Sequence, residues 1–201
     1  MTAQPVSPET SEEVKDRIIH SSLKLFARKG YAATSLREIA EEARTTKPMI
    51  YYYFGNKEGL YVSLLKDQLQ GLGEAIERAI DPAADIETNV RNYASAYVDY
   101  ILAQEECIAL LLREMFGLGE QVVREFTVAL EAQVRSHLRR LLEKGMEQGR
   151  YRDIDPEACS LAINGIIHTF VMRRVYRDIR IDKERVLSQV IDYYVRGLMA
   201  H

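Results

Sequence analysis

Residues 47–57 read KPMIYYYFGNK, a short stretch with two lysines, three consecutive tyrosines and no Asp or Glu. Lys and Tyr side chains donate hydrogen bonds, and phosphate oxygens accept them. If the stretch is a helix with Ile50 turned inward, its period places Phe54 beside Ile50 and leaves Met49, Tyr51 and Tyr52 on the outer side. Such a helix suits the major groove of a nucleic-acid duplex, with its first residues at base edges and its tyrosines at phosphates.

A second short helix is expected just before this stretch. Its apolar residues fall at positions i, i+3, i+4 and i+7, and they are Leu36, Ile39, Ala40 and Ala43. Thr34 or Ser35 is its expected N-cap, and Glu38, three residues after Ser35, completes a capping box. The chain breaks after it and restarts with Thr46 as N-cap and Pro48 in the first turn. The pattern therefore predicts a helix-turn-helix.

Residues 34–40, followed by PMIYYYFGNKEGL at residues 48–60, resemble the DNA-binding domain of the TetR/AcrR family of bacterial transcription regulators. The run Tyr-Tyr-x-Phe-x-Asn-Lys-Glu-x-Leu, residues 51–60, is among the more specific helix-turn-helix signatures. The family usually has Gly at the turn, then an apolar residue and Ser, where this chain has Arg44, Thr45 and Thr46. Arg44 would therefore have to accept the backbone angle that Gly normally supplies.

The contacts with DNA are expected from residues 34–57. The residues expected at base edges are Arg37, Lys47, Pro48 and Met49. Those expected at phosphates or at the start of the same surface are Thr34, Ser35, Thr46, Tyr51, Tyr52, Tyr53 and Lys57. Lys57 also opens the next helix, where its ammonium group and the free helix N–H groups could hold one phosphate together.

Composition allows one domain or a small domain joined to a larger one, since the 201 residues are 47% apolar. The net charge of −3 does not indicate nucleic-acid binding. Residues 1–57 hold nine Lys and Arg against seven Asp and Glu, whereas residues 58–201 hold 18 against 23. We predict an all-α protein of about nine helices, with a helix-turn-helix domain at residues 9–57 and a ligand-binding and dimerisation domain at residues 58–201.

Seven further helical patterns surround the helix-turn-helix, with no convincing strand. They cover residues 9–29, 57–80, 86–103, 105–116, 120–148, 156–176 and 182–199. Thr10 or Ser11 caps the first, and Asp155 and Asp182 cap the last two. Gly71 and Gly73 lie inside the helix at residues 57–80, where they indicate either close packing or a flexible point that transmits ligand-driven movement.

The helix at residues 156–176 is apolar on two sides, and so is the last helix, so each must be buried on two sides. We therefore expect a homodimer in which these helices form a four-helix bundle about a two-fold axis, as the family resemblance also implies. The interface residues we expect are Ala158, Leu161, Ala162, Gly165, Leu187, Ile191, Tyr194 and Leu198. A dimer would place two reading helices on the half-sites of a palindromic operator.

The resemblance also implies a cavity for a small effector in the C-terminal helices. The candidates are polar or aromatic residues in apolar helices, namely Tyr93, Tyr97, Arg113, Glu114, Phe116, Asn164, His168 and Met172. Each has a structural alternative, because a tyrosine at helical spacing often belongs to the core. Ser160, Asn164 and His168 fall at i, i+4 and i+8, which fits either a pocket wall or the wet edge of the helix.

No feature of the sequence indicates an enzyme, a metal site or a cofactor. The four histidines show no metal-ligand spacing, and Cys107 and Cys159 fit reduced core thiols. No secretory signal or membrane-spanning run is apparent, so we expect a cytoplasmic protein without membrane contact. The predicted function is a regulator, expected to be a repressor, that binds DNA and is released by an apolar or amphipathic effector. The alternatives are a helical interaction protein whose helix-turn-helix does not bind DNA, and an all-helical enzyme using residues such as His168.

Overall fold

A computed structural model describes residues 10–104, 121–177, 179–180 and 182–200. Helices make up the regular structure of these residues, and one isolated bridge joins Tyr151 to Met199. The chain divides into two compact units between Leu65 and Lys66. The all-α prediction is confirmed. The helix expected at residues 105–116 lies outside the described residues.

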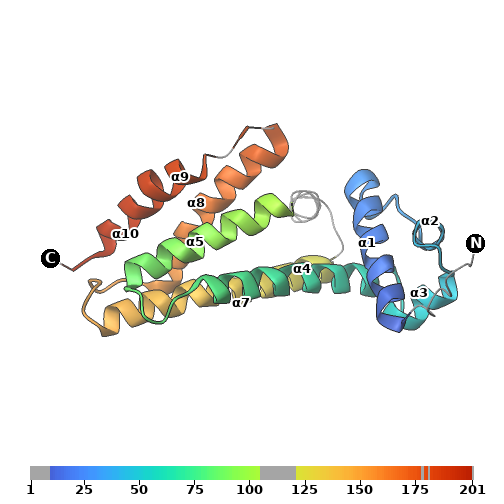
Figure 1. Ribbon diagram of the computed structural model, residues 1–201, viewed down its shortest axis with the longest axis horizontal. Coiled ribbons are helices and arrows are strands. Elements are labelled where there is room, and N and C mark those ends of the chain that lie inside the picture. The colour runs from blue at the N-terminus through green and yellow to red at the C-terminus, as the bar shows by residue number, and fades with distance from the viewer. Residues whose placement is uncertain (1–9, 105–120, 178, 181, 201) are drawn as a thin grey trace, which may run out of the picture. The chain divides into compact units, whose positions relative to one another are not determined.

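The N-terminal unit contains α1 (Ser11–Lys29), α2 (Leu36–Glu42), α3 (Lys47–Phe54) and the start of α4 (Lys57–Ala79) (Figure 1). Thr10 caps α1 through a capping box with Glu13, and Ser35 caps α2 through a capping box with Glu38. The sequence left Thr34 and Ser35 open as caps of α2, and the structure selects Ser35.

The core of this unit forms where the apolar sides of its helices meet. Phe26 of α1, Tyr31 of the following loop and Tyr61 of α4 form an aromatic cluster with ring centroids 4.9 to 5.6 Å apart. Ile39 of α2 and Ile50 of α3 are fully buried in the same unit. Burial of Ile50 fixes which side of α3 faces outward.

The C-terminal unit contains the rest of α4, then α5 (Ile86–Ala103), α7 (Gln121–Glu147) and α8 (Pro156–Arg177). The last helical segment is one predicted helix in three parts: α9 (Lys183–Val186), a π-helical turn (Leu187–Ile191) and α10 (Asp192–Leu198). Helix α5 is central, since it packs against α7, α8, the π-turn and α10. No helix among the described residues is long and apolar enough to span a membrane.

Ion pairs attach the last helical segment to α5. Arg91 lies 2.5 Å from Asp192 and 3.4 Å from Glu184, and Lys183 lies 2.6 Å from Asp99. At the other end of the unit, the Arg152 N–H donates to the Leu198 carbonyl at 3.0 Å. These contacts hold the end of the chain against the helices that precede it.

Candidate nucleic-acid interface

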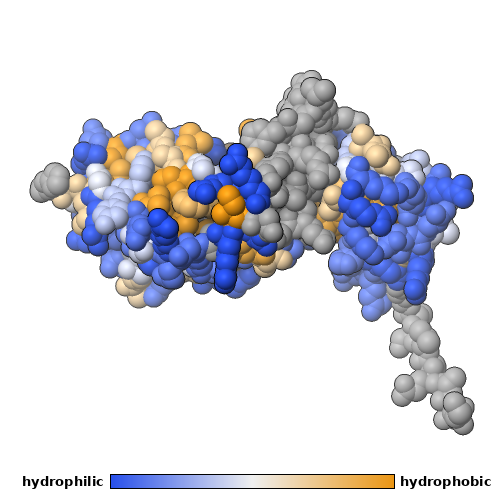
Figure 2. All heavy atoms as spheres, turned by 90° about the horizontal axis from the view of Figure 1, so that it is seen from above, coloured by the Kyte–Doolittle hydropathy of each residue, from blue (hydrophilic) through white to orange (hydrophobic). Residues whose placement is uncertain are grey.

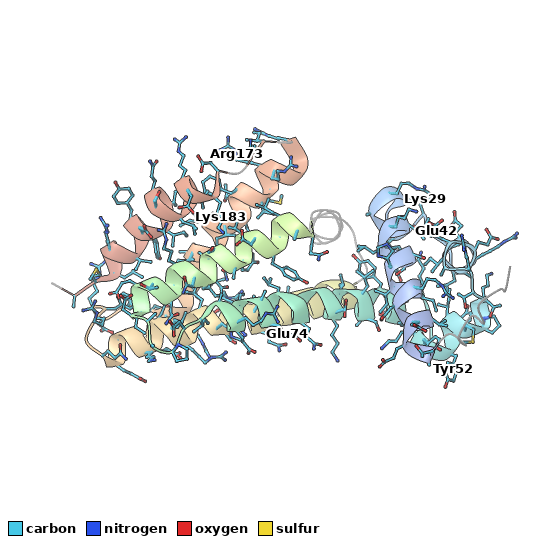
Figure 3. All side chains as sticks on the ribbon, in the orientation of Figure 1. Lys29, Glu42, Tyr52, Glu74, Arg173 and Lys183 are labelled. Carbon is cyan, nitrogen blue, oxygen red and sulfur yellow. The ribbon has the colours of Figure 1, made fainter. Side chains whose placement is uncertain are left out.

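Helix α3 turns its two most exposed tyrosines away from the core. Ile50 and Phe54 are buried, whereas Tyr51 is 53% and Tyr52 78% exposed. Tyr52 projects away from the rest of the N-terminal unit (Figure 3). Lys47 and Pro48 are also exposed, and no Asp or Glu lies in the helix. The outer side of α3 therefore presents hydrogen-bond donors without a competing carboxylate of its own.

Three neighbouring hydroxyl groups have roles inside the unit. Thr34 is 1% exposed, and its hydroxyl donates to the Gly30 carbonyl at 2.8 Å. The Tyr53 hydroxyl lies 2.8 Å from the Ser11 hydroxyl at the start of α1. The Ser35 hydroxyl donates to the Glu38 carboxylate at 2.9 Å while it caps α2. Thr46, in contrast, is exposed and caps α3 without a side-chain hydrogen bond. Burial therefore removes Thr34 from the set that can reach a phosphate.

The basic residues of the predicted surface differ in how they are held. Lys47 is exposed. The Lys57 ammonium group lies 4.3 Å from the centroid of the Tyr31 ring and donates to the Ala32 carbonyl at 3.4 Å. Arg37 pairs with Glu41 at 2.8 Å on the solvent side of α2. Such an exposed pair contributes little to stability and can open when another anion approaches.

The acidic residues of α2 are each paired with a basic side chain. Glu42 lies 2.7 Å from Lys24, and Glu38 pairs with Lys29. The hydrogen bonds from Lys29 and Ser35 lower the pKa of Glu38 to about 2. These pairs offset the negative charge next to the outer side of α3, which reduces its repulsion of a phosphate backbone.

The turn between α2 and α3 confirms the expectation for Arg44, which has φ +50°. The Thr45 N–H donates to the Ala40 carbonyl at 2.9 Å and the Arg44 N–H to the Glu41 carbonyl at 3.2 Å. This is a Schellman motif, in which Gly usually occupies the position of Arg44. The left-handed conformation costs a non-glycine residue about 1–2 kcal/mol. The sequence did not predict that Nε of Arg17, from α1, donates to the Ala43 carbonyl at 2.6 Å.

In the C-terminal unit, four of the residues proposed for the effector cavity meet in pairs between α5 and α8. The Tyr93 hydroxyl donates to Oδ1 of Asn164 at 3.0 Å, and the Tyr97 hydroxyl is hydrogen-bonded to Nε2 of His168 at 2.7 Å. Burial raises the pKa of Tyr93 and lowers the pKa of His168. At neutral pH these pairs are therefore uncharged polar groups inside an apolar unit.

The stripe of Ser160, Asn164 and His168 is not a wet edge of α8. Ser160 and Asn164 are buried, and His168 is half-buried. Met172 is half-buried and packs against the same core. Arg113, Glu114 and Phe116, the other residues proposed for the cavity, lie outside the described residues. Described residues line two hollows of about 310 and 530 Å³. None of the residues proposed for the cavity is among the residues that line them.

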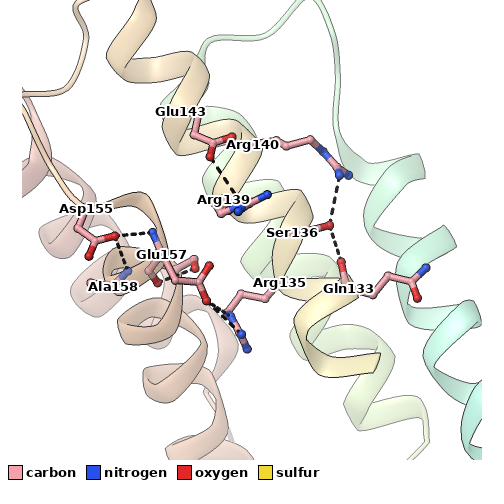
Figure 4. A network of polar contacts seen from close by, with 10 residues as sticks. Gln133, Arg135, Ser136, Arg139, Arg140, Glu143, Asp155, Glu157 and Ala158 are labelled. Carbon is pink, nitrogen blue, oxygen red and sulfur yellow. Dashed lines mark hydrogen bonds and ion pairs between the residues drawn. The ribbon is translucent and has the colours of Figure 1, made fainter. Parts of the chain in front are cut away.

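Arg135 of α7 lies close to these pairs and was missed in the sequence. Its guanidinium group pairs with Glu157 at 3.2 Å, and Asp155 caps α8 beside it by accepting from the Glu157 and Ala158 N–H groups (Figure 4). The positive charge of Arg135 contributes, after burial, to the lowered pKa of His168. In the sequence, the signal for Arg135 was its position next to Val134, which lies on the buried side of α7.

The proposed dimer surface divides into exposed and buried parts. On α8, Leu161 is 49% exposed, Ala158 and Gly165 are exposed, and Ala162 is half-buried. Leu187, Ile191 and Leu198 are instead buried in the core of the single chain, so they offer little surface to a second copy. The outer side of α10 carries the half-buried Tyr194 and Tyr193, which is 65% exposed. Apolar residues gather on the face of the C-terminal unit seen in Figure 2.

A helix-turn-helix with an exposed, acid-free second helix, followed by an all-helical unit, defines a DNA-binding regulator. Residues 18–64 match the family model described as bacterial regulatory proteins, tetR family, and residues 84–198 match a tetracyclin repressor-like C-terminal domain. The chain belongs to the tetR family, as the sequence resemblance indicated. Members of this family and the curated relatives are transcriptional regulators.

Three known proteins illustrate the similarity. The transcriptional repressor NicS of Pseudomonas putida is 27% identical over 74% of this chain and 70% of its own length. The crystal structure of the TetR family regulator PfmR from Thermus thermophilus is 29% identical, with a TM-score of 0.73 over 92% of this chain and 100% of that chain. The regulator FadR from Bacillus subtilis, solved in complex with stearoyl-CoA, shares the fold at 22% identity, with a TM-score of 0.80 over 91% and 98% of the chains.

Proposed function

We propose that this tetR-family regulator is a repressor that binds a palindromic operator as a homodimer and leaves it when a small amphipathic effector binds. The observation that carries the proposal is the outer side of α3, where Tyr51 and Tyr52 are exposed and no carboxylate is present. Hydroxyl and ammonium donors on such a surface suit phosphates, and the first turn of the helix suits base edges. The repressor NicS, as a relative, supports the direction of regulation.

The proposed contacts come from residues that are exposed or, for Met49 and Lys57, half-buried. Arg37, Lys47, Pro48 and Met49 are assigned to base edges, as in the sequence analysis. Ser35, Thr46, Tyr51, Tyr52 and Lys57 are assigned to phosphates. The Tyr53 hydroxyl is hydrogen-bonded to the Ser11 hydroxyl. Tyr53 is therefore assigned to a phosphate on the condition that this hydrogen bond is kept. Thr34 is assigned to holding the loop before α2.

The homodimer is proposed to form through the exposed side of α8 and the outer side of α10. Leu161, Gly165 and Tyr193 are exposed there, and apolar side chains on such a surface favour burial against a second copy. Sedimentation analysis tests this with Leu161→Glu, which is expected to give monomers. Val128→Glu is the matched control, since Val128 is an exposed apolar residue of α7. A Leu161→Glu variant that stays dimeric would remove this surface from the proposal.

The effector is proposed to be amphipathic because of the groups that surround the Tyr93 and Tyr97 pairs. Their partners Asn164 and His168 are uncharged, and apart from Arg135 the neighbouring core residues are apolar. Uncharged hydrogen-bonding groups among apolar side chains suit a ligand with a large apolar body and few polar atoms. Stearoyl-CoA, bound to the FadR relative in fold, is amphipathic: its acyl chain is a large apolar body of this kind, and it is joined to a charged CoA group that would need contacts elsewhere. Acyl-CoA thioesters are therefore the first compounds to test.

A footprint on the DNA upstream of the chain's own gene tests the function, first alone and then with acyl-CoA thioesters of increasing length. We expect a protected palindrome that one compound releases. Protection that the compound strengthens would indicate an activator. Absence of protection at low salt would favour the interaction protein without DNA contact, and turnover of a compound would favour the enzyme.

A further inference from the structure

The α2–α3 turn has an acceptor that only a side chain satisfies. Ala43 is the C-cap of α2, and it is fully buried. The last carbonyls of a helix have no partner inside that helix, and a buried carbonyl without a partner is costly. The Ala40 and Glu41 carbonyls accept from Thr45 and Arg44 N–H groups. The Ala43 carbonyl accepts instead from Nε of Arg17 at 2.6 Å, across 26 residues of sequence.

This hydrogen bond holds the peptide group between Ala43 and Arg44, which directly precedes the strained residue Arg44. The Ala43 carbonyl belongs to the planar peptide group that ends at the Arg44 nitrogen. Arg44 has φ +50°, and a non-glycine residue has a more stable alternative at negative φ. A change to that alternative would turn the peptide group and withdraw its oxygen from Arg17. The Arg17 guanidinium group therefore favours the left-handed conformation of Arg44 over the conformation with negative φ.

The direction of α3 depends on this residue, because Arg44 is two residues before the N-cap Thr46. The Thr46 side chain makes no cap hydrogen bond at the start of α3, so it does not fix the direction of α3 in place of the hydrogen bond from Arg17. The positive charge of Arg17 at the C-terminal end of α2 also offsets the helix dipole there. One side chain of α1 thus acts on the end of α2 and on the entry to α3.

We propose that Arg17 is a positioning residue for DNA recognition, which compensates for Arg44 at the glycine position of the turn and holds α3 in its reading direction. Arg17 would contribute to operator affinity without contacting DNA. The inference rests on DNA binding by the helix-turn-helix.

Fluorescence anisotropy with full-length protein tests the proposal on two duplexes of equal length, one carrying the palindrome found by footprinting and one scrambled. Arg17→Met is expected to weaken operator binding about tenfold and scrambled-duplex binding less than about threefold, because misdirection of α3 affects base readout most. The salt dependence should stay that of the wild type. Lys15→Met, which removes an exposed charge from the same helix, should change neither affinity.

Rescue separates positioning from general stability. Arg44→Gly in the Arg17→Met background should restore operator affinity to within about twofold of the wild type, since Gly adopts positive φ without strain. Failure of this rescue would overturn the proposal. A salt slope reduced by about 0.9 in Arg17→Met would also overturn it, because that is the signature of a lost phosphate contact.

Hydrogen exchange without DNA keeps the test independent of the operator. Arg17→Met should speed exchange of the Thr45 N–H, and Arg44→Gly should slow it again. Unchanged exchange would overturn the proposal even if no operator were found. Faster exchange with unchanged discrimination between the duplexes would reduce Arg17 to a structural role, while leaving the proposed function intact.

Discussion

Helix α3 of the N-terminal unit and helix α5 of the C-terminal unit use tyrosine in opposite ways. In α3, Tyr52 is 78% exposed and Tyr51 is also exposed. In α5, Tyr93 is fully buried and its hydroxyl has a partner in Asn164. A buried hydroxyl must find its hydrogen bond inside the protein, whereas an exposed one exchanges with water and remains available to a ligand. The same residue type therefore indicates an outer binding surface on α3 and a packed interior beside α5.

The ion pairs of the two units join helices in both cases but differ in what lies beside them. In the N-terminal unit, Lys24 of α1 pairs with Glu42 of α2 and offsets a carboxylate next to the surface proposed for DNA. In the C-terminal unit, the pairs of Arg91 with Asp192 and Lys183 with Asp99 join α5 to the last helical segment. The first arrangement therefore also reduces repulsion of an anion, whereas the second only connects parts of a scaffold.

The largest effect should come from truncating a buried tyrosine. Tyr93→Ala should lower the free energy of unfolding by about 3–5 kcal/mol, because it leaves a cavity and an unpaired Asn164. Tyr52→Ala should change it by less than about 0.5 kcal/mol. Urea unfolding followed by circular dichroism measures both. Similar losses of unfolding free energy in the two variants would contradict the contrast between α3 and α5.

Removing the exposed hydroxyl should act on DNA binding instead. Tyr52→Phe should weaken binding to all DNA sequences alike, by about 0.5–1.5 kcal/mol, since it removes one phosphate hydrogen bond. Ser136→Ala is the control, because it removes a side-chain hydroxyl from α7, outside the surfaces proposed for DNA and for the dimer. Anisotropy titrations on operator and scrambled duplexes compare the two. An effect confined to the operator would assign Tyr52 to a base edge.

The lysines at the two ends of α3 should contribute through charge. Lys57→Ala should reduce the slope of log affinity against log salt by about 0.9, as expected for one phosphate contact. Lys47→Ala should weaken operator binding more than binding to a scrambled duplex, because Lys47 is assigned to a base edge. Lys57 is the sharper case, because its ammonium group already lies over the Tyr31 ring. An unchanged slope for Lys57→Ala would show that this contact is structural.

Local signals made the N-terminal unit predictable. The capping boxes, the Pro48 start of α3 and the apolar spacings lie within a few residues of the elements that they define. The angle of Arg44 was predictable because the turn requires it. The contact of Arg17 with the Ala43 carbonyl was not, since no local pattern connects residues 26 positions apart.

The C-terminal unit was predictable in its helices and less so in their faces. Helix α5 has the expected bounds, and two of its tyrosines hydrogen-bond to polar residues of α8, while their place in an effector cavity stays a prediction. The last helical segment is apolar on two sides, and periodicity does not say which side faces the chain's own core. Leu187, Ile191 and Leu198 were therefore assigned to the dimer surface although the core contains them.

Mild acid should destabilise the C-terminal unit before the N-terminal one. Burial lowers the pKa of His168, so below its unfolded value of about 6.5 the unfolded chain binds the additional proton. Stability should therefore fall as the pH drops from 7 through 6 toward the folded pKa, by less than about 1.4 kcal/mol per pH unit for this group. His137 acts in the same direction.

Urea unfolding at several pH values measures this dependence. His168→Gln should flatten it, and His137→Gln should have a smaller effect because the nearby Glu77 carboxylate opposes the lowering of the His137 pKa. Glu38, whose pKa is lowered to about 2 from 4.5, should begin to destabilise the N-terminal unit only at pH values below the range in which His168 acts. A loss of stability near pH 6 that persists in both histidine variants would contradict the assignment.

The smallest effect concerns the two glycines of α4. A Cβ atom at Gly71 would lie 2.4 Å from the Tyr100 hydroxyl oxygen, so close packing accounts for that glycine. At Gly73 no described atom lies within 4 Å of the corresponding position. Gly73→Ala should therefore raise the free energy of unfolding by about 0.5–1 kcal/mol, and Gly71→Ala should lower it.

Thermal melts of the two variants measure this difference in stability. Effector titrations of the operator complex test whether α4 bends at Gly73. Close packing does not account for Gly73, and the sequence left a flexible point as the other interpretation. If α4 bends there during release, Gly73→Ala should keep operator affinity and need more effector for half release, because a stiffer helix opposes the bend. An unchanged effector requirement in a more stable variant would show that α4 moves as a straight helix.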